Sequence, residues 1–291
     1  MRYASRHPYA VPAPRLRSVD VLLRLLVAAL LVSSYGCQTR GPRTASHESL
    51  GAVLWIQTSA EYAASTHQAY RLAATNLDRA LADPLWTAAV EQGDAYSILP
   101  PAVILDLDQT VLDTSPYNAR IVLDHGSHSE RRFAEWCRQS TAPAIPGVKG
   151  FLDHVTARGV TVIYISARAE ALRECTTQNL RSLGLPLEGQ QHLLLRDGTP
   201  ATRKTLQRSR AASRHRILLL IGDDLGDFVA GAKSDREKRL AIVDEHARRW
   251  GRQWIVLPNP IFGSWSASLY GFDHSLPRAE RLDRMLPQLR P

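Results

Sequence analysis

Two carboxylates stand directly after an apolar segment in the first half of the chain. Asp106 and Asp108 follow the apolar residues 102–105, and Thr110 comes two positions later. A continuous apolar run is typical of a buried parallel strand, and ligands bind beyond the carboxyl ends of such strands. Because neighbouring carboxylates repel each other, the pair favours a bound cation or a shared proton. The segment therefore predicts a metal-assisted reaction in which a carboxylate takes part.

Further polar side chains follow other apolar segments that predict strands, and a lysine lies in the segment before the fourth of these strands. They are Ser166, Lys204, Asp223, Asp224 and Asp227. A carboxylate nucleophile splits a hydrolysis into two easier steps, and a hard divalent cation such as Mg²⁺ is bound by carboxylate and phosphate oxygens. A serine hydroxyl and a lysine ammonium would bind the remaining phosphoryl oxygens. The set is typical of phosphoryl transfer through an aspartyl phosphate.

The elements that must position these residues alternate between strands and helices. Apolar runs predict strands over 102–107, 160–165, 193–195, 217–221 and 254–257. Helical patterning is expected over 49–82, 86–91, 150–157, 169–183, 202–213 and 234–250. Such alternation is typical of βαβ units. The fold class is therefore α/β, with a Rossmann-like parallel sheet flanked by helices.

Residues 115–145 interrupt this alternation, directly after the first core strand. They are rich in polar and aromatic side chains, and we expect them to form a small cap over the site. His125 and His128 lie three positions apart, but no acid or cysteine in a suitable context accompanies them. We interpret them as part of a polar cap surface rather than as metal ligands.

The first 36 residues are typical of an export signal. Basic residues such as Arg15 precede an apolar stretch over 21–32, which Arg24 interrupts, and small residues precede Cys37. The stretch is shorter than the roughly 20 apolar residues that span a bilayer, so it indicates a signal peptide. It resembles a bacterial lipoprotein signal, with Cys37 as the lipidated first residue of the mature protein. The alternatives are a plain cleaved signal and an uncleaved anchor.

The charge of the chain is concentrated in this leader. Of 36 basic and 28 acidic residues, five and one respectively lie within residues 1–36, which leaves 31 basic and 27 acidic residues. The arginines between positions 203 and 216 are interpreted mainly as a solvated helix face. Without interleaved aromatic residues, this balance does not predict a nucleic-acid partner.

Beyond Cys37 the sequence has two cysteines, Cys137 and Cys175. A disulfide in an oxidising periplasm and two separate buried thiols are both consistent with the sequence. No pair of cysteines has the CxxC spacing, so a thiolate zinc site is not predicted.

The order of the motifs resembles the haloacid dehalogenase (HAD) superfamily, which places DxDxT, serine, lysine and GDDxxxD along the chain in this order. More narrowly, the chain resembles the class C bacterial lipoprotein acid phosphatases. The likeness covers roughly residues 50–271, and the local sequences that carry it lie at 99–108, 116–118, 143–147, 222–228 and 257–265.

This resemblance implies a role for each residue at the strand ends. Asp106 would be the nucleophile and a Mg²⁺ ligand. Asp108 would protonate the leaving oxygen and then activate water, and its backbone carbonyl would also bind the metal. Asp223 would complete the shell of one Mg²⁺ per chain. Ser166 and Lys204 would hold the phosphoryl group.

Three further residues would support these ones. Thr110 would stabilise the loop, and Asp227 would orient Lys204 or a metal-bound water, with Asp224 as the competing candidate. Two positions depart from the family pattern: Gln109 stands where an acid is frequent, and Ala167 replaces a frequent asparagine.

The implied activity is Mg²⁺-dependent hydrolysis of phosphomonoesters, with nucleoside 5'-monophosphates as candidate substrates. Trp136 and Phe262 would stack on a base, although Trp136 could equally pack the cap onto the core. The alternatives are phosphotransfer from the same intermediate and a non-catalytic envelope binding protein. Residues 38–48 would tether a domain over 49–291 to the envelope of a Gram-negative bacterium, in the outer membrane or periplasm. Residues 273–291 could form a helix at an oligomer contact.

Overall fold

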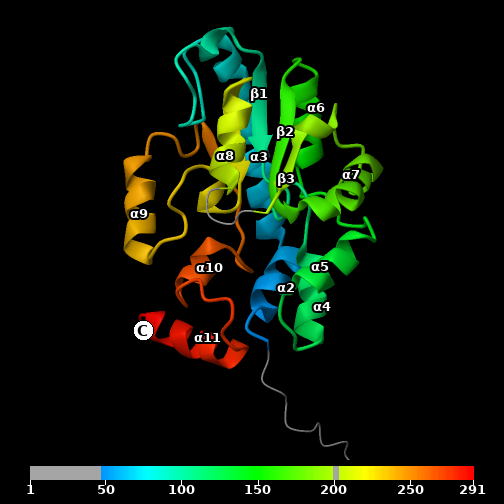
Figure 1. Ribbon diagram of the computed structural model, residues 1–291, viewed down its shortest axis with the longest axis vertical. Coiled ribbons are helices and arrows are strands. Elements are labelled where there is room, and N and C mark those ends of the chain that lie inside the picture. The colour runs from blue at the N-terminus through cyan, green and yellow to red at the C-terminus, as the bar shows by residue number, and fades with distance from the viewer. Residues whose placement is uncertain (1–46, 199–202) are drawn as a thin grey trace, which may run out of the picture. The chain divides into compact units, whose positions relative to one another are not determined.

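The computed structural model describes residues 47–198 and 203–291 (Figure 1). The predicted signal peptide, Cys37 and nearly all of the tether lie outside these residues. His47–Pro291 form one compact unit. No helix within the described ranges has the length and apolar character that a membrane crossing requires.

In the described part of the chain, a five-stranded parallel sheet has the strand order β3-β2-β1-β4-β5. The strands are β1 (Pro101–Leu105), β2 (Thr161–Ala169), β3 (Leu193–Arg196), β4 (Arg216–Gly222) and β5 (Trp254–Val256). They coincide with the predicted apolar runs, because strands covered on both faces are apolar along their length. β4 is buried at every position. The α/β class with a parallel sheet is therefore confirmed.

Successive residues of β1 face opposite sides of the sheet, as the geometry of a strand requires. Val103 and Leu105 belong to a core cluster shared with α3 (Ala60–Ala82) and α6 (Val148–Thr156). Ile104 belongs to a second cluster, which includes residues of α8 (Arg203–Ala212). Figure 1 shows α8 in front of the sheet and α3 behind it. The sheet is therefore the middle of three layers.

The remaining α-helices precede the first strand, connect the strands or follow the last strand. They are α2 (Leu50–Thr58), α4 (Ser115–Leu123), α5 (Glu130–Cys137), α7 (Arg173–Ser182), α9 (Arg236–Glu245), α10 (Ser264–Ser268) and α11 (Arg278–Met285). The helical pattern over 49–82 is divided at Ser59, whose Oγ accepts a hydrogen bond from the Tyr62 amide at 3.1 Å and caps α3. The segment predicted as a cap contains α4 and α5, and α4 packs against α2.

The helix predicted around residues 86–91 is absent from the structure. This segment instead supplies hydrogen bonds to β4, at positions where the short strand β5 does not reach. The Ala88 amide donates to the Ile217 carbonyl and the Trp86 indole donates to the Leu218 carbonyl, each at 2.7 Å. Because buried carbonyls need partners, tertiary hydrogen bonding outweighs the local helical pattern.

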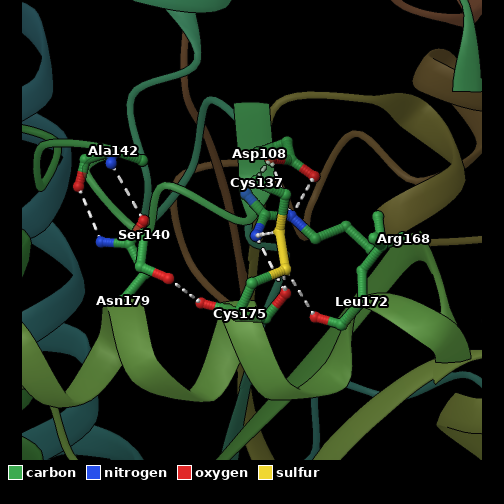
Figure 2. The surroundings of a disulfide bond; sticks show 9 residues. Asp108, Cys137, Ser140, Ala142, Arg168, Leu172, Cys175 and Asn179 are labelled. Atoms are coloured by element: carbon green, nitrogen blue, oxygen red, sulfur yellow. Dashed lines mark hydrogen bonds and ion pairs between the residues drawn. A yellow bond between two sulfur atoms is a disulfide. The ribbon is translucent and has the colours of Figure 1, made fainter. Parts of the chain in front are cut away.

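A disulfide joins Cys137, the last residue of α5, to Cys175 in α7 (Figure 2). The sequence left this pairing open. The bond connects the segment inserted after β1 to the helix that follows β2.

Candidate active site

The loop after β1 is held in a tight turn that presents Asp106 and Asp108. The Asp106 amide donates to the Ile221 carbonyl of β4 at 3.0 Å. The amides of residues 110–112 all donate to the Leu107 carbonyl. Tyr70 of α3 donates its hydroxyl proton to the Thr110 carbonyl at 2.6 Å. Helix, strand and turn therefore fix the two carboxylates at the carboxyl edge of the sheet.

Gln109 is fully buried in this turn and adopts a positive φ of 61°. Its Oε1 atom accepts hydrogen bonds from the amide and the hydroxyl of Thr114, at 2.8 and 3.2 Å. The amide side chain therefore ties the turn to the start of α4. Gln109 stands where the family often has an acid, and its described side-chain contacts are with the loop.

Lys204 lies between two carboxylates that come from different strand ends. Its ammonium donates to Asp106 Oδ1 at 2.6 Å and to Asp227 Oδ1 at 2.5 Å. Carboxylate oxygens of Asp106, Asp223 and Asp227 all lie within 4.8 Å of one another. Residues far apart in the sequence are thus brought together because β1 and β4 are neighbours.

The position of Asp227 depends on a glycine. Asp227 Oδ2 accepts hydrogen bonds from the amides of Asp223 and Asp224, at 3.1 and 2.9 Å. A Cβ atom on Gly222 would lie 2.2 Å from Asp227 Oδ2 and 2.4 Å from its Cβ atom. Glycine is therefore the residue that allows this carboxylate to fold back against the end of β4.

Burial dominates the electrostatics of the cluster. It raises the pKa of Asp106 to about 7, although Lys204 opposes the shift. Burial and the neighbouring Asp106 raise the pKa of Asp223 well above its ordinary value. Burial alone would lower the pKa of Lys204, but Asp106 and Asp227 raise it. These carboxylates therefore gain more from a nearby cation than exposed ones would.

The two remaining acids after β4 have different surroundings. Asp223 accepts hydrogen bonds from the Thr110 hydroxyl at 2.9 Å and from Asn259 Nδ2 at 2.8 Å. Asp224 instead accepts from the amide and hydroxyl of Ser264, at 2.5 and 2.9 Å. Asp223 thus faces the cluster, and Asp224 fastens the start of α10. It is Asp227, not Asp224, that contacts Lys204.

Asp108 is paired with an arginine that we did not select from the sequence. Arg168 Nη2 donates to Asp108 Oδ1 at 2.7 Å, and Nε approaches both carboxylate oxygens. Ser166 is buried, and its Oγ atom accepts a hydrogen bond from the Arg168 amide at 3.1 Å. Arg168 comes two positions after Ser166, at the end of an apolar run. A basic residue at such a position, close to predicted site acids, is the signal that could have identified Arg168.

Arg208 is a second arginine whose role was missed. It is fully buried, and its guanidinium donates to the carbonyls of Gly226 and Asp227 and to the Glu91 carboxylate. Arg216 is also buried. The expectation of a solvated face is therefore wrong for these two residues. The helical spacing of four between Lys204 and Arg208 was a usable signal, because it places both side chains on one side of α8.

The two aromatic residues proposed for substrate binding differ in accessibility. Trp136 is only 4% exposed, and its ring packs against Tyr117 and Phe133 with centroid separations of 5.7 and 5.6 Å. Phe262 is half-buried, and its amide approaches Asn259 Oδ1. The structure therefore places Trp136 inside the cap and Phe262 near the Asn259–Asp223 contact.

The donor atoms of the cluster suit a hard divalent cation. All three side chains that approach one another offer carboxylate oxygens, which are the ligands that Mg²⁺ and Ca²⁺ take. Lys204 brings one positive charge to these three acids. The buried aspartate cluster could therefore bind a divalent metal ion.

Two curated plant proteins match part of the chain. Acid phosphatase 1 of Solanum lycopersicum is 26% identical over 174 residues, which cover 55% of this chain and 57% of that protein. Vegetative storage protein 1 of Arabidopsis thaliana is 28% identical over 134 residues, or 43% of this chain and 48% of that protein. The chain thus spans about half the length of the curated relatives it matches.

Solved structures and a family model match a larger part. The class C acid phosphatase from Bacillus anthracis superposes with a TM-score of 0.76 at 31% identity, over 84% of this chain and 98% of that one. The same enzyme with tungstate bound gives a TM-score of 0.74 at 29% identity over the same shares. The model of the HAD superfamily, subfamily IIIB (acid phosphatase), matches residues 41–265. The chain therefore belongs to subfamily IIIB of the HAD superfamily, the acid phosphatases.

Proposed function

We propose that the protein hydrolyses phosphomonoesters in a Mg²⁺-dependent reaction through an aspartyl phosphate on Asp106. The observation that carries this proposal is the cluster at the ends of β1 and β4, where Lys204 bridges Asp106 and Asp227. The related structure with tungstate supports it, because tungstate is a tetrahedral oxyanion like phosphate. The positive charge of Lys204 lies where a phosphoryl oxygen would approach the nucleophile.

The reaction has two steps. A carboxylate oxygen of Asp106 attacks phosphorus, and the bond to the leaving oxygen breaks while the Asp108 carboxyl donates its proton to that oxygen. Water then attacks phosphorus and gives a proton to Asp108, and the bond to Asp106 breaks to release phosphate. Ser166 and Lys204 would hold phosphoryl oxygens throughout.

The carboxylates of Asp106 and Asp223 would hold Mg²⁺, together with the backbone carbonyl of Asp108. Mg²⁺ bound there would offset the repulsion between Asp106 and the anionic substrate. Asp227 is the third acid of the cluster, and one of its oxygens is already paired with Lys204. Its other oxygen accepts hydrogen bonds from the amides of Asp223 and Asp224. Because both oxygens are engaged, we assign Asp227 to the orientation of Lys204.

The test is hydrolysis of p-nitrophenyl phosphate by the wild type and by the Asp106→Asn variant, each with Mg²⁺ and with EDTA. We expect wild-type activity that EDTA abolishes and that added Mg²⁺ restores, and no activity in the variant. Asp197→Asn is the control, because this exposed carboxylate follows β3 and, among the described residues, forms an ion pair only with Arg210, at 3.8 Å. Activity that survives in Asp106→Asn, or that ignores EDTA, would contradict the mechanism.

For the substrate, we propose nucleoside 5'-monophosphates. Phe262 supports this choice, since it is partly accessible and adjoins the residue that contacts Asp223. We expect Phe262→Ala to lower kcat/KM for nucleotides several-fold more than for p-nitrophenyl phosphate. Equal loss on both substrates in a competition assay would argue against base stacking.

Lipidation of Cys37 in the envelope of a Gram-negative bacterium also remains our proposal, and it rests on the sequence alone. Metabolic labelling with a radioactive fatty acid should mark the wild type and leave the Cys37→Ala variant unmarked. Equal labelling of both proteins would show that the lipid is attached elsewhere.

A further inference from the structure

Arg168 forms hydrogen bonds with both carboxylate oxygens of Asp108. Its Nη2 and Nε atoms donate to Asp108 Oδ1 at 2.7 and 3.2 Å, and Nε also lies 3.1 Å from Oδ2. The Arg168 side chain is 1% exposed, whereas that of Asp108 is 18% exposed. The arginine therefore binds the carboxylate from the protein interior, and part of the carboxylate stays accessible.

The guanidinium is itself held from behind. Nη1 donates to the Thr176 hydroxyl at 3.0 Å and lies 3.6 Å from Cys137 Sγ. The Phe133 ring lies 5.3 Å away, within the range of a cation–π contact. Figure 2 shows the Arg168 side chain reaching between Asp108 and the disulfide. The contacts from α5 and α7 therefore hold the guanidinium in place against Asp108.

Both oxygens of Asp108 are held by the guanidinium. Nη2 donates to Oδ1, and Nε lies at nearly the same distance from Oδ1 and from Oδ2. A carboxyl that delivers a proton must face the leaving group, and the transfer depends strongly on geometry. The two contacts fix the plane of the carboxyl group, while 18% of the Asp108 side chain stays exposed.

We propose that Arg168 is a positioning residue for Asp108, which fixes the orientation of the carboxyl group for proton transfer to the leaving oxygen. This inference rests on the proposed function, in which Asp108 is the general acid. It predicts a dependence on the leaving group. An alkyl oxygen must be protonated as it leaves, whereas a p-nitrophenolate leaves without much assistance.

The experiment compares kcat/KM for glycerol 2-phosphate and p-nitrophenyl phosphate, because kcat/KM reports the step in which the leaving group departs. We expect Arg168→Lys to lower the value for glycerol 2-phosphate at least about tenfold more than the value for p-nitrophenyl phosphate. Lysine keeps the charge but loses the two-sided grip. Arg168→Ala should show the same bias, and added guanidinium should partly restore the kcat/KM of this variant for glycerol 2-phosphate.

Arg216→Lys is the matched control. Arg216, the first residue of β4, is also buried, but it donates to the Asp83 carbonyl. Its replacement should leave the ratio of kcat/KM values for the two substrates unchanged. An equal loss on both substrates in Arg168→Lys, or no loss on either, would overturn the proposal. If Arg168→Ala does not fold, the result for Arg168→Lys alone decides whether the proposal holds.

A double variant separates this inference from the proposed function. In an Asp108→Asn background, Arg168→Lys should cause no further leaving-group bias, because the acid is already absent. A further bias in that background would overturn the proposal. If Asp106→Asn retains activity, the proposed function itself fails. If Asp106 is essential but Arg168→Lys shows no bias, only the positioning role fails.

Discussion

Asp223 is the member of the acidic cluster that depends most on neutral partners. The Thr110 hydroxyl and the Asn259 amide each donate to one of its oxygens. Asn259 also accepts a hydrogen bond from the Ile261 amide at 3.0 Å, so its orientation is fixed by its own loop. These two neutral donors orient the Asp223 carboxylate and add no charge to the cluster.

We therefore predict that Asn259→Ala weakens Mg²⁺ binding about tenfold, because partners that orient metal ligands contribute on this scale. The measurement is the rise of the unfolding midpoint as Mg²⁺ is added. Thr110→Val should act in the same direction. Asn118→Ala is the control, since the Asn118 side chain donates to the Thr114 carbonyl and to no other group in the described ranges. Unchanged Mg²⁺ affinity in both test variants would show that these hydrogen bonds do not orient a ligand.

Arg208 and Arg210 lie on the same helix but should respond very differently to truncation. Arg208→Ala would leave the Glu91 carboxylate, which is 12% exposed, without its counter-charge. Breaking such a buried pair costs about 3–5 kcal/mol. Arg210 is 67% exposed, so Arg210→Ala should change the free energy of unfolding by less than about 0.5 kcal/mol. Urea denaturation of the two variants checks this difference, and similar losses in both would contradict it.

The contrast between these arginines shows where sequence reasoning stops. Asp106, Lys204, Asp223 and Asp227 could be grouped in advance because each stands near a strand end in a motif of fixed order. Helical spacing places Arg208 on the same side of α8 as Lys204, but its burial could not be predicted. A basic helix is interpreted as solvated unless the buried acid that pairs with it is known. Glu91 lies 117 residues away in a segment without regular structure.

At the scale of elements, apolar runs were sufficient to identify the strands, because the sheet is covered on both faces. Their register then explains the site. Leu105 of β1 pairs with Tyr164 of β2 and with Ile221 of β4. The polar residues that come after these paired positions, Asp106, Ser166 and Asp223, are therefore nearly level with one another. The segment around 86–91 was predicted wrongly because its structure depends on β4, which no local pattern records.

The disulfide allows a prediction about elements. Replacing both Cys137 and Cys175 with alanine should lower the free energy of unfolding by about 2–4 kcal/mol, because the cross-link closes a loop of 38 residues. Dithiothreitol should destabilise the wild type to a similar extent. The double variant is the control for the reductant, and dithiothreitol should not change its stability further. A wild type that is indifferent to reduction would show that the two helices stay together without the bond.

At the scale of the whole compact unit, the last helix is tied to the first described residues. Arg278 of α11 donates from Nε to Glu48 Oε2 at 2.6 Å, and these side chains are 27% and 33% exposed. Burial is the largest single influence and would raise the pKa of Glu48. The hydrogen bond from Arg278, a backbone hydrogen bond and the charges of His47 and Arg278 together outweigh burial and lower the pKa below 4.5. The folded state therefore binds this proton less tightly than the unfolded state does. The resulting stabilisation is present above pH 4.5 and is lost as the pH falls through the lowered value.

We predict that Arg278→Gln makes α11 open more readily at pH 7, by about 0.5–1 kcal/mol for a partly exposed pair. The difference from the wild type should narrow as the pH falls from 5 toward 3, because protonated Glu48 no longer attracts Arg278. Hydrogen exchange of the α11 amides measures this opening. Arg284→Gln is the matched control. Within the part of the chain that the structure describes, Arg284 forms an ion pair only with Glu280 of the same helix, so its replacement should not release α11 from residue 48. A difference between wild type and Arg278→Gln that is independent of pH would refute the role of the ion pair. In that case, packing alone would hold the end of the chain.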